Sequence, residues 1–148
     1  MKKVLILLLI FFFITLHAQN GVTSIKSSHN VQATVDSLLK ILNAKGMKIF
    51  AQIDHSKGAK SVGKELRPTQ LIIFGNPKVG TVLMQCNQQV GLDLPQKMLV
   101  WQDAKNQTWI SFNNPNYLAE RHNIQKCNEK LITKIKAILI NIAIAASK

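Results

Sequence analysis

The segment from Gln70 to Phe74 constrains the fold of this chain more than any other feature. Apolar residues occupy both parities of the segment, which lies between Pro68 and Gly75. A short apolar run bounded by such turn residues is typical of a central strand that is covered on both faces. The sequence therefore predicts a domain built around a β-sheet.

Four other segments have strand-like patterns. Apolar residues alternate with polar ones from Met47 to Asp54, which is the period of a strand with one covered face. The runs 97–102 and 108–112 are joined by Asp103-Ala104-Lys105-Asn106-Gln107, so a hairpin is the simplest interpretation. A first short strand is predicted over 22–26.

Helical patterns separate and follow these strands. Apolar residues recur at helical spacing over 31–44, and Gly46 then provides a left-handed C-terminal stop. The polar segment 55–67 is predicted to be a loop with a short helical turn. At the end of the chain an apolar helix face extends from Ile124 to Ile142. The order of elements predicts a two-layer α+β domain with a mainly antiparallel sheet and helices packed on one side.

The N-terminus has the pattern of a secretory signal. Lys2 and Lys3 precede an apolar run over 4–16, and Ala18 follows two positions after the run ends. We expect cleavage after Ala18, which leaves residues 19–148 as a single domain, exported to the periplasm or the extracellular space, with no transmembrane span in the mature chain. An uncleaved N-terminal anchor is the alternative, because Leu16 is a poor residue three positions before the cut.

The chain carries a formal net charge of +12. Such a balance favours an anionic partner, whether nucleic acid, anionic lipid or an acidic cell-wall polymer, and export makes nucleic acid the least favoured. A solvated basic surface is the alternative. The same two alternatives, an anionic partner or a solvated surface, apply to the predicted helix face that carries Lys126, Lys130 and Lys134, which lie four residues apart.

Cys86 and Cys127 are the two cysteines of the chain. Both are predicted to lie on the apolar side of helical segments, so we expect reduced and mostly buried thiols. A disulfide between these two residues, which lie 41 positions apart, is the alternative.

The turn from Gly75 to Thr81 could hold an anion. Asn76 suits the N-cap of a helix and Pro77 its first position, while Lys78 and Thr81 add a charge and a hydroxyl near free backbone N–H groups. A phosphate or carboxylate is the expected occupant. A well-capped strand-to-helix turn without a ligand is the alternative, and the absent Gly-Lys-Ser/Thr ending excludes a P-loop.

His55 and His122 are the histidines with neighbouring charged residues. Either could act as a general base, although surface or capping roles are the more usual ones. No zinc-ligand spacing is present, so no metal site is predicted, and the sequence identifies no cofactor.

The run from Arg67 to Gln85 closely resembles the bacterial and archaeal domain-of-unknown-function family 302. The segments 91–95 and 117–122, together with Asp54-His55, extend the resemblance over about 22–139. It implies a fold similar to half of a TATA-binding-protein saddle and a homodimer, but no activity. Phe112 and Asn114 stand where relatives tend to have Tyr and Asp, so the hydroxyl and the carboxylate that an acid–base role would use are missing beside the second Asn-Pro pair, Asn114-Pro115. Asn123 stands where Gly is common.

These observations give three hypotheses for function. The first is an exported binding module that takes a small anionic ligand or a partner protein near five residues, which are Asn76, Lys78, Thr81, Arg67 and His55. The second is an enzyme in which His55 or His122 is a general base. The third is an interaction protein whose basic C-terminal helix contacts an anionic envelope component.

Overall fold

Five antiparallel strands form one sheet in the computed structural model, which describes residues 21–148. The predicted signal peptide, residues 1–18, lies outside the described residues. The strands are β1 (Val22–Lys26), β2 (Lys48–Asp54), β3 (Thr69–Gly75), β4 (Gln96–Gln102) and β5 (Thr108–Asn113), in the spatial order β1-β5-β4-β3-β2. The helices are α1 (Val31–Ala44), α2 (His55–Ser61), α3 (Pro77–Cys86), the 3-10 helix η1 (Gln88–Leu92), α4 (Pro115–Arg121) and α5 (Glu129–Ala146).

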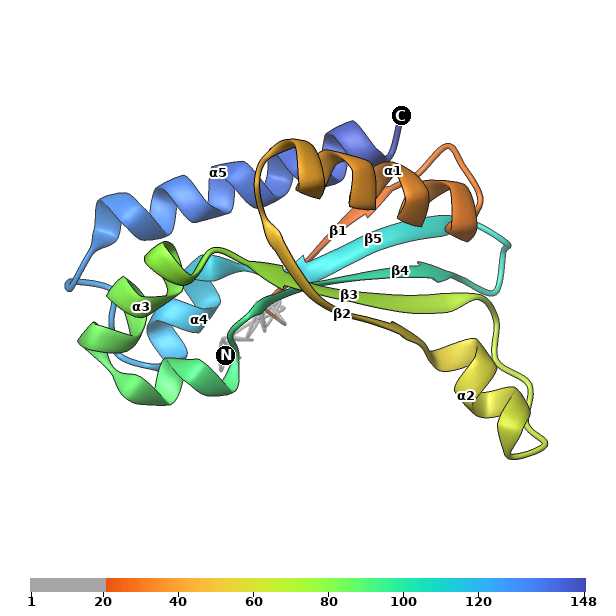
Figure 1. The fold of residues 1–148 in the computed structure, drawn as a ribbon, viewed down its shortest axis with the longest axis horizontal. Coiled ribbons are helices and arrows are strands. Elements are labelled where there is room, and N and C mark those ends of the chain that lie inside the picture. The colour runs from red at the N-terminus through yellow and green to blue at the C-terminus, as the bar shows by residue number, and fades with distance from the viewer. Residues whose placement is uncertain (1–20) are drawn as a thin grey trace, which may run out of the picture.

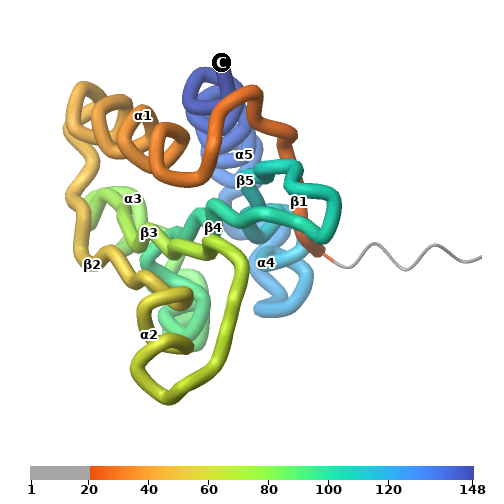
Figure 2. The backbone as a smooth tube through the Cα atoms, turned by 90° about the vertical axis from the view of Figure 1, so that its right-hand side faces the viewer, coloured from red at the N-terminus to blue at the C-terminus, as the bar shows by residue number. Residues whose placement is uncertain are grey.

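Helices α1 and α5 lie together over one face of the sheet, as Figures 1 and 2 show from two directions. Their apolar stripes pack on alternate residues of the central strands, and this contact forms the core. Fully buried members of the core are Val35, Leu38 and Leu42 of α1, Ile72 of β3, Met98 and Val100 of β4, Ile110 of β5 and Ile142 of α5. The predicted two-layer α+β fold is confirmed.

Elements with strong local signals form where the sequence predicts them. Helix α1 spans 31–44, and Gly46 follows it with φ +64°, a left-handed conformation that favours glycine. The β4–β5 hairpin closes through a hydrogen bond of 2.9 Å from the Asp103 backbone N–H to the Gln107 carbonyl. Helix α5 begins later than expected, at Glu129, after Asn128 accepts a hydrogen bond from the Leu131 backbone N–H.

A β-bulge at Phe50 changes which residues of β2 face the core. The alternation in the sequence predicts that Ile49 and Ala51 share a covered face. In the structure Ile49 lies opposite Phe74 and Ala51 opposite Ile73, so Phe50 is an extra residue between them. Because a bulge inserts one residue into the alternation, Ile49 packs against the core while Ala51 turns to the other face.

Only one face of β3 is buried, which corrects the prediction of a strand covered on both sides. Gln70, Ile72 and Phe74 are buried beneath the helices, whereas Leu71 and Ile73 are half-buried. The prediction was wrong because both main covering helices, α1 and α5, pack on the same side of the sheet. Within residues 21–148, no helix has the length and apolarity needed to cross a bilayer.

Candidate functional site

A groove of about 390 Å³ lies between α3 and α5 at one end of the sheet. Its floor comes from the start of β2, the end of β3 and the start of β4, and the segment 91–96 closes it from the side. Helix α3 begins at the Asn-Pro pair that follows β3, and Figure 1 shows it beyond the end of that strand. Its size falls within the ordinary range of small-molecule sites, which is roughly 300–1,000 Å³.

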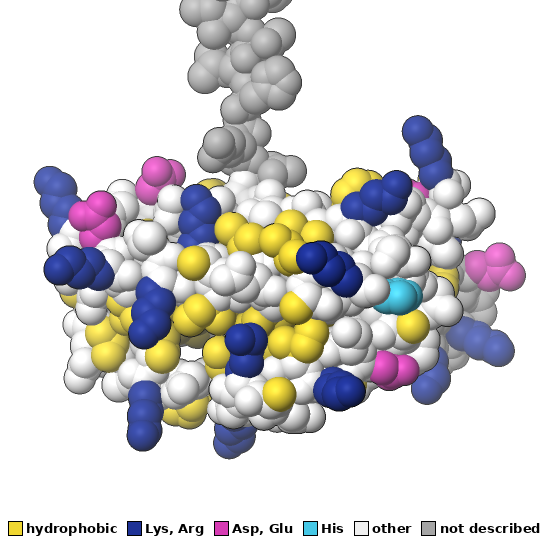
Figure 3. Space-filling model, turned by 90° about the horizontal axis from the view of Figure 1, so that it is seen from above, with side chains coloured by type: hydrophobic (Ala, Val, Ile, Leu, Met, Phe, Trp, Pro, Cys, Tyr) yellow, Lys and Arg dark blue, Asp and Glu magenta, His cyan; other side chains and the backbone are white. Residues whose placement is uncertain are grey.

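The lining of this groove is apolar. Of the eighteen described residues that line it, none is charged, and polar side chains come only from Asn76, Thr81 and Gln96. Figure 3 shows hydrophobic side chains gathered around a hollow at the lower left, with Lys and Arg side chains standing around it. An apolar molecule or apolar chain therefore fits this groove better than a fully hydrated ion.

The predicted helix start at Asn76 forms one end of the groove. The Asn76 side-chain oxygen accepts a hydrogen bond of 3.0 Å from the Lys78 backbone N–H, as the predicted N-cap requires. Lys78 and Thr81 are exposed, and Thr81 lines the groove. Across from them, the Lys48 ammonium lies 5.0 Å from the centroid of the Phe50 ring, a cation–π contact on a lining residue.

The other residues predicted to share this site lie elsewhere. His55 and Arg67 flank the end of the β2–β3 pair where Asp54 lies opposite Gln70, whereas Asn76 follows the other end, where Lys48 lies opposite Gly75. Seven strand residues separate the two ends, which corresponds to roughly 20 Å. Helix α2, which begins at His55, and helix α4 lie at opposite ends of the molecule in Figure 1, so His55 and His122 do not converge on one pocket.

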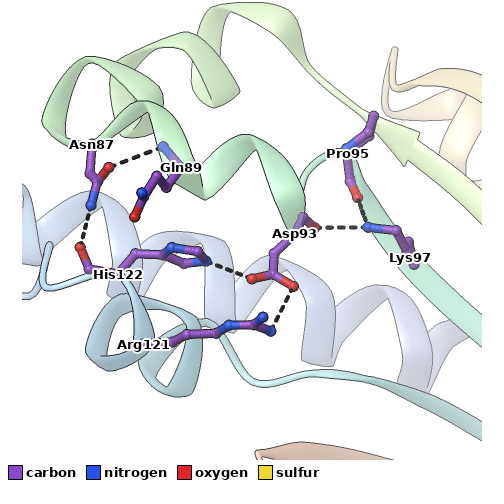
Figure 4. A network of polar contacts seen from close by, with 7 residues as sticks. All are labelled: Asn87, Gln89, Asp93, Pro95, Lys97, Arg121 and His122. Atoms are coloured by element: carbon purple, nitrogen blue, oxygen red, sulfur yellow. Dashed lines mark hydrogen bonds and ion pairs between the residues drawn. The ribbon is translucent and has the colours of Figure 1, made fainter.

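His122 takes part in a polar network with Asp93, which sequence reasoning did not single out as a functional residue (Figure 4). The His122 Nε2 atom lies 2.6 Å from Asp93 Oδ2, and Arg121 Nη1 lies 3.3 Å from Asp93 Oδ1. Lys97 Nζ donates hydrogen bonds to the backbone carbonyls of Asp93 and Pro95. The only sign of this contact in the sequence was that both segments, 91–95 and 117–122, contribute to the family resemblance.

These contacts connect the segment 91–96, which closes the groove from the side, to the end of α4. A general base must reach the proton that it abstracts, but the His122 side chain is only 5% exposed and its Nε2 already contacts a carboxylate. Asn87 adds a second tie, because its side-chain amide donates to the His122 carbonyl. Within the described part of the chain, no group of three or more His, Cys, Asp and Glu side chains is placed to hold a metal ion.

Cys86 and Cys127 form a disulfide, so the prediction of two reduced, buried thiols was wrong. Cys86 is half-buried at the end of α3. Cys127 is exposed and lies in the loop before α5, not in a helix as predicted. The turn after α4 brings this loop back to α3, and the two Cα atoms lie 6.0 Å apart, a separation that a disulfide spans. The disulfide joins α3, which forms one wall of the groove, to the loop that leads into α5, which forms the other wall.

Comparison with known proteins decides the family. The model of the family described as "Domain of unknown function DUF302" matches residues 23–142. The chain belongs to this family. A crystal structure of an uncharacterized conserved DUF302 protein from Bacillus stearothermophilus has a TM-score of 0.77 with 20% identity, and it covers 86% of this chain and 98% of the other. It shows that the fold is shared.

Similar sequences also occur within longer proteins. The DUF302 chain is 43% identical over 105 residues to the fluoride-specific ion channel FluC 1 of Brucella suis and to that of Brucella abortus. In each case the match covers 71% of this chain, but the chain spans only about 40% of the relative, 41% and 39% respectively.

Proposed function

We propose that this DUF302 domain is a binding module for amphiphilic small molecules that combine an apolar body with an acidic head group. The groove between α3 and α5 carries the proposal. Its volume suits a small molecule, and its almost wholly apolar lining would take an acyl or similar chain out of water. Each buried methylene of such a chain contributes about 0.8 kcal/mol to binding.

The charges around the groove support an acidic head group. Lys48 stands on the lining residue Phe50, and Lys78 lies between the lining residues Pro77 and Val79. The described lining contains no carboxylate that would repel an anion. A carboxylate or phosphate at the Asn76 end of the groove would therefore meet two cations, although both are solvated and each contributes modestly. Apolar burial thus supplies most of the affinity, and the head group sets orientation.

Filling the groove at Gly80 should strongly weaken binding. Gly80 lines the groove within α3, and a Cβ atom built there would lie 3.7 Å from Leu94 Cδ1, an ordinary contact. Gly80→Phe should weaken the binding of dodecanoate at least about tenfold, because the ring takes the place of the chain. Gly80→Ala is the matched control: it should stabilise the helix by about 0.5–1 kcal/mol and leave binding nearly unchanged. Titration calorimetry below the aggregation concentration of dodecanoate is the measurement.

Head-group recognition is tested in the same titrations. Lys48→Gln and Lys78→Gln should each weaken dodecanoate binding about threefold, and acetate and inorganic phosphate should give no heat. If dodecanoate bound equally well to wild type and to Gly80→Phe, the groove would not be its site. If acetate bound as well as dodecanoate, the site would be a simple anion site at the α3 start and the amphiphile proposal would fail.

We also propose that the mature protein is exported and forms a homodimer. The N-terminal pattern supports export, and so does the Cys86–Cys127 disulfide, because such bonds persist in oxidising compartments.

The half-buried apolar residues Leu71, Leu99 and Trp101, on the sheet face opposite α1 and α5, support a homodimer. Native mass spectrometry of protein purified from its own host tests both. We expect a chain that begins near Gln19 and a complex of two chains. A monomer, or a chain that retains residues 1–18, would contradict the corresponding proposal.

A further inference from the structure

The segment 55–68 between β2 and β3 forms an arm that stands out from the domain. It consists of α2 and the loop after it, and Figure 1 shows it beyond the end of the sheet. Helix α2 buries none of its residues, and within 55–68 only Ser56 and Ala59 are even half-buried. The arm therefore contributes little to the core and leaves nearly all of its side chains in solvent.

Hydrogen bonds at its base hold this exposed arm in a defined position. Ser56 Oγ accepts from the Thr69 backbone N–H at 2.9 Å, and Arg67 Nε donates to the Gln102 carbonyl at 3.1 Å. Asp54 caps α2 by accepting from the Lys57 backbone N–H, which holds the pKa of Asp54 below its ordinary value. These contacts at the base orient the arm, so the side chains at its tip stay free to contact a partner.

The tip combines apolar and cationic side chains. Val62 is 68% exposed and Leu66 is 49% exposed, both among the large hydrophobic residues that the fold leaves in solvent. The arm carries four cationic residues, Lys57, Lys60, Lys64 and Arg67, against one acidic residue, Glu65. Among residues 21–148, ion-pair contacts within 4 Å occur only at Asp93, so none of these four cations makes such a contact with a carboxylate. Lys57, at the base of the arm, still lies in the field of Asp54, whereas Lys60 and Lys64 are further along the arm.

We propose that this arm docks the protein on the surface of a membrane that contains anionic lipid. Lysine and arginine side chains would meet the lipid phosphates, and Val62 and Leu66 would enter the boundary between head groups and acyl chains. A nucleic acid would satisfy the cations but would give the two apolar side chains no apolar surroundings. The inference is independent of the ligand proposed for the groove, because the arm lies at the other end of the β2–β3 pair.

Vesicle binding tests the proposal directly. Wild-type protein is sedimented with vesicles of phosphatidylcholine alone and with vesicles that contain roughly one-third phosphatidylglycerol. We expect binding to the anionic vesicles only, weakened by salt, because surface charges are screened. Lys60→Glu/Lys64→Glu should weaken this binding at least about 25-fold, since each cation contributes about fivefold. Val62→Ser/Leu66→Ser, which leaves the charge unchanged, should weaken it at least about fivefold.

A second basic surface provides the matched control. Lys130 and Lys134 are exposed on α5, and Lys130→Glu/Lys134→Glu changes the net charge by the same amount as the arm variant. This control should stay within about twofold of wild type, and thermal melts should show all variants folded. The proposal is overturned if wild type does not bind anionic vesicles or if the α5 variant loses as much binding as the arm variant. It is also overturned if Val62→Ser/Leu66→Ser binds like wild type, or if the arm variants lose duplex DNA binding while vesicle binding is unchanged.

Discussion

Removal of the Cys86–Cys127 disulfide should lower the free energy of unfolding by about 4 kcal/mol, close to the loop-entropy value for a crosslink of this length. The bond joins residues 41 positions apart, so it excludes many conformations of the unfolded chain. Cys86→Ala/Cys127→Ser should show this loss in urea unfolding. Wild type measured with a dithiol reductant should lose a similar amount, because reduction also opens the crosslink.

The single variants Cys86→Ala and Cys127→Ser control for the side chains themselves. Each opens the same crosslink, so each should match the double variant to within about 1 kcal/mol. A double variant that lost less than about 1 kcal/mol would show that the crosslink constrains the unfolded chain very little. Because the bond joins α3 to the segment before α5, we also expect the double variant to bind dodecanoate more weakly at temperatures where the wild-type groove is still intact.

Replacing Asp93 should have the next largest effect. Asp93→Ala removes the acceptor from His122 Nε2 at a site where the two side chains are 12% and 5% exposed. Removing one partner of a buried, charged hydrogen bond leaves the other without a partner, and we expect a loss of about 3 kcal/mol. Arg121 adds little, because its side chain is half exposed. Urea unfolding of the variant at neutral pH is the measurement.

Two further variants test whether this loss belongs to the buried contact. Asp36→Ala removes an exposed carboxylate that accepts a hydrogen bond from Gln32 at 2.9 Å, and it should change stability by no more than about 0.5 kcal/mol. Asp93→Asn keeps the size of the side chain and one acceptor oxygen, so it should lose less than Asp93→Ala. Equal losses in Asp93→Ala and Asp36→Ala would rule out a special role for the contact with His122.

The Asp93 variant should also affect the groove. Leu94, Pro95 and Gln96 follow directly and line it, while Lys97 fixes the same segment through the carbonyls of Asp93 and Pro95. We expect Asp93→Ala to weaken dodecanoate binding although Asp93 itself is not a lining residue. Asp93 would then be a positioning residue, which acts through the segment 94–96.

Elements whose causes are local could be predicted from the sequence. Helix α1 follows from apolar spacing over four turns and the glycine after it, and the start of α3 follows from an Asn-Pro pair whose cap is seen in the structure. The β4–β5 hairpin follows from two strand-like runs with a short polar connection. Periodicity and capping act between residues a few positions apart, so they can be recognised without knowing how the chain closes.

The candidate site depends on contacts that form only when the chain folds. The bulge at Phe50, the open face of β3, the pairing of Cys86 with Cys127 and the contact of Asp93 with His122 all depend on which segments meet. Two of these contacts join residues 41 and 29 positions apart. The groove likewise depends on the packing of α3, α5 and the sheet end. Such contacts form only when the sheet and its helices assemble, because their energy comes from burial and geometry shared between distant segments, which no local pattern encodes.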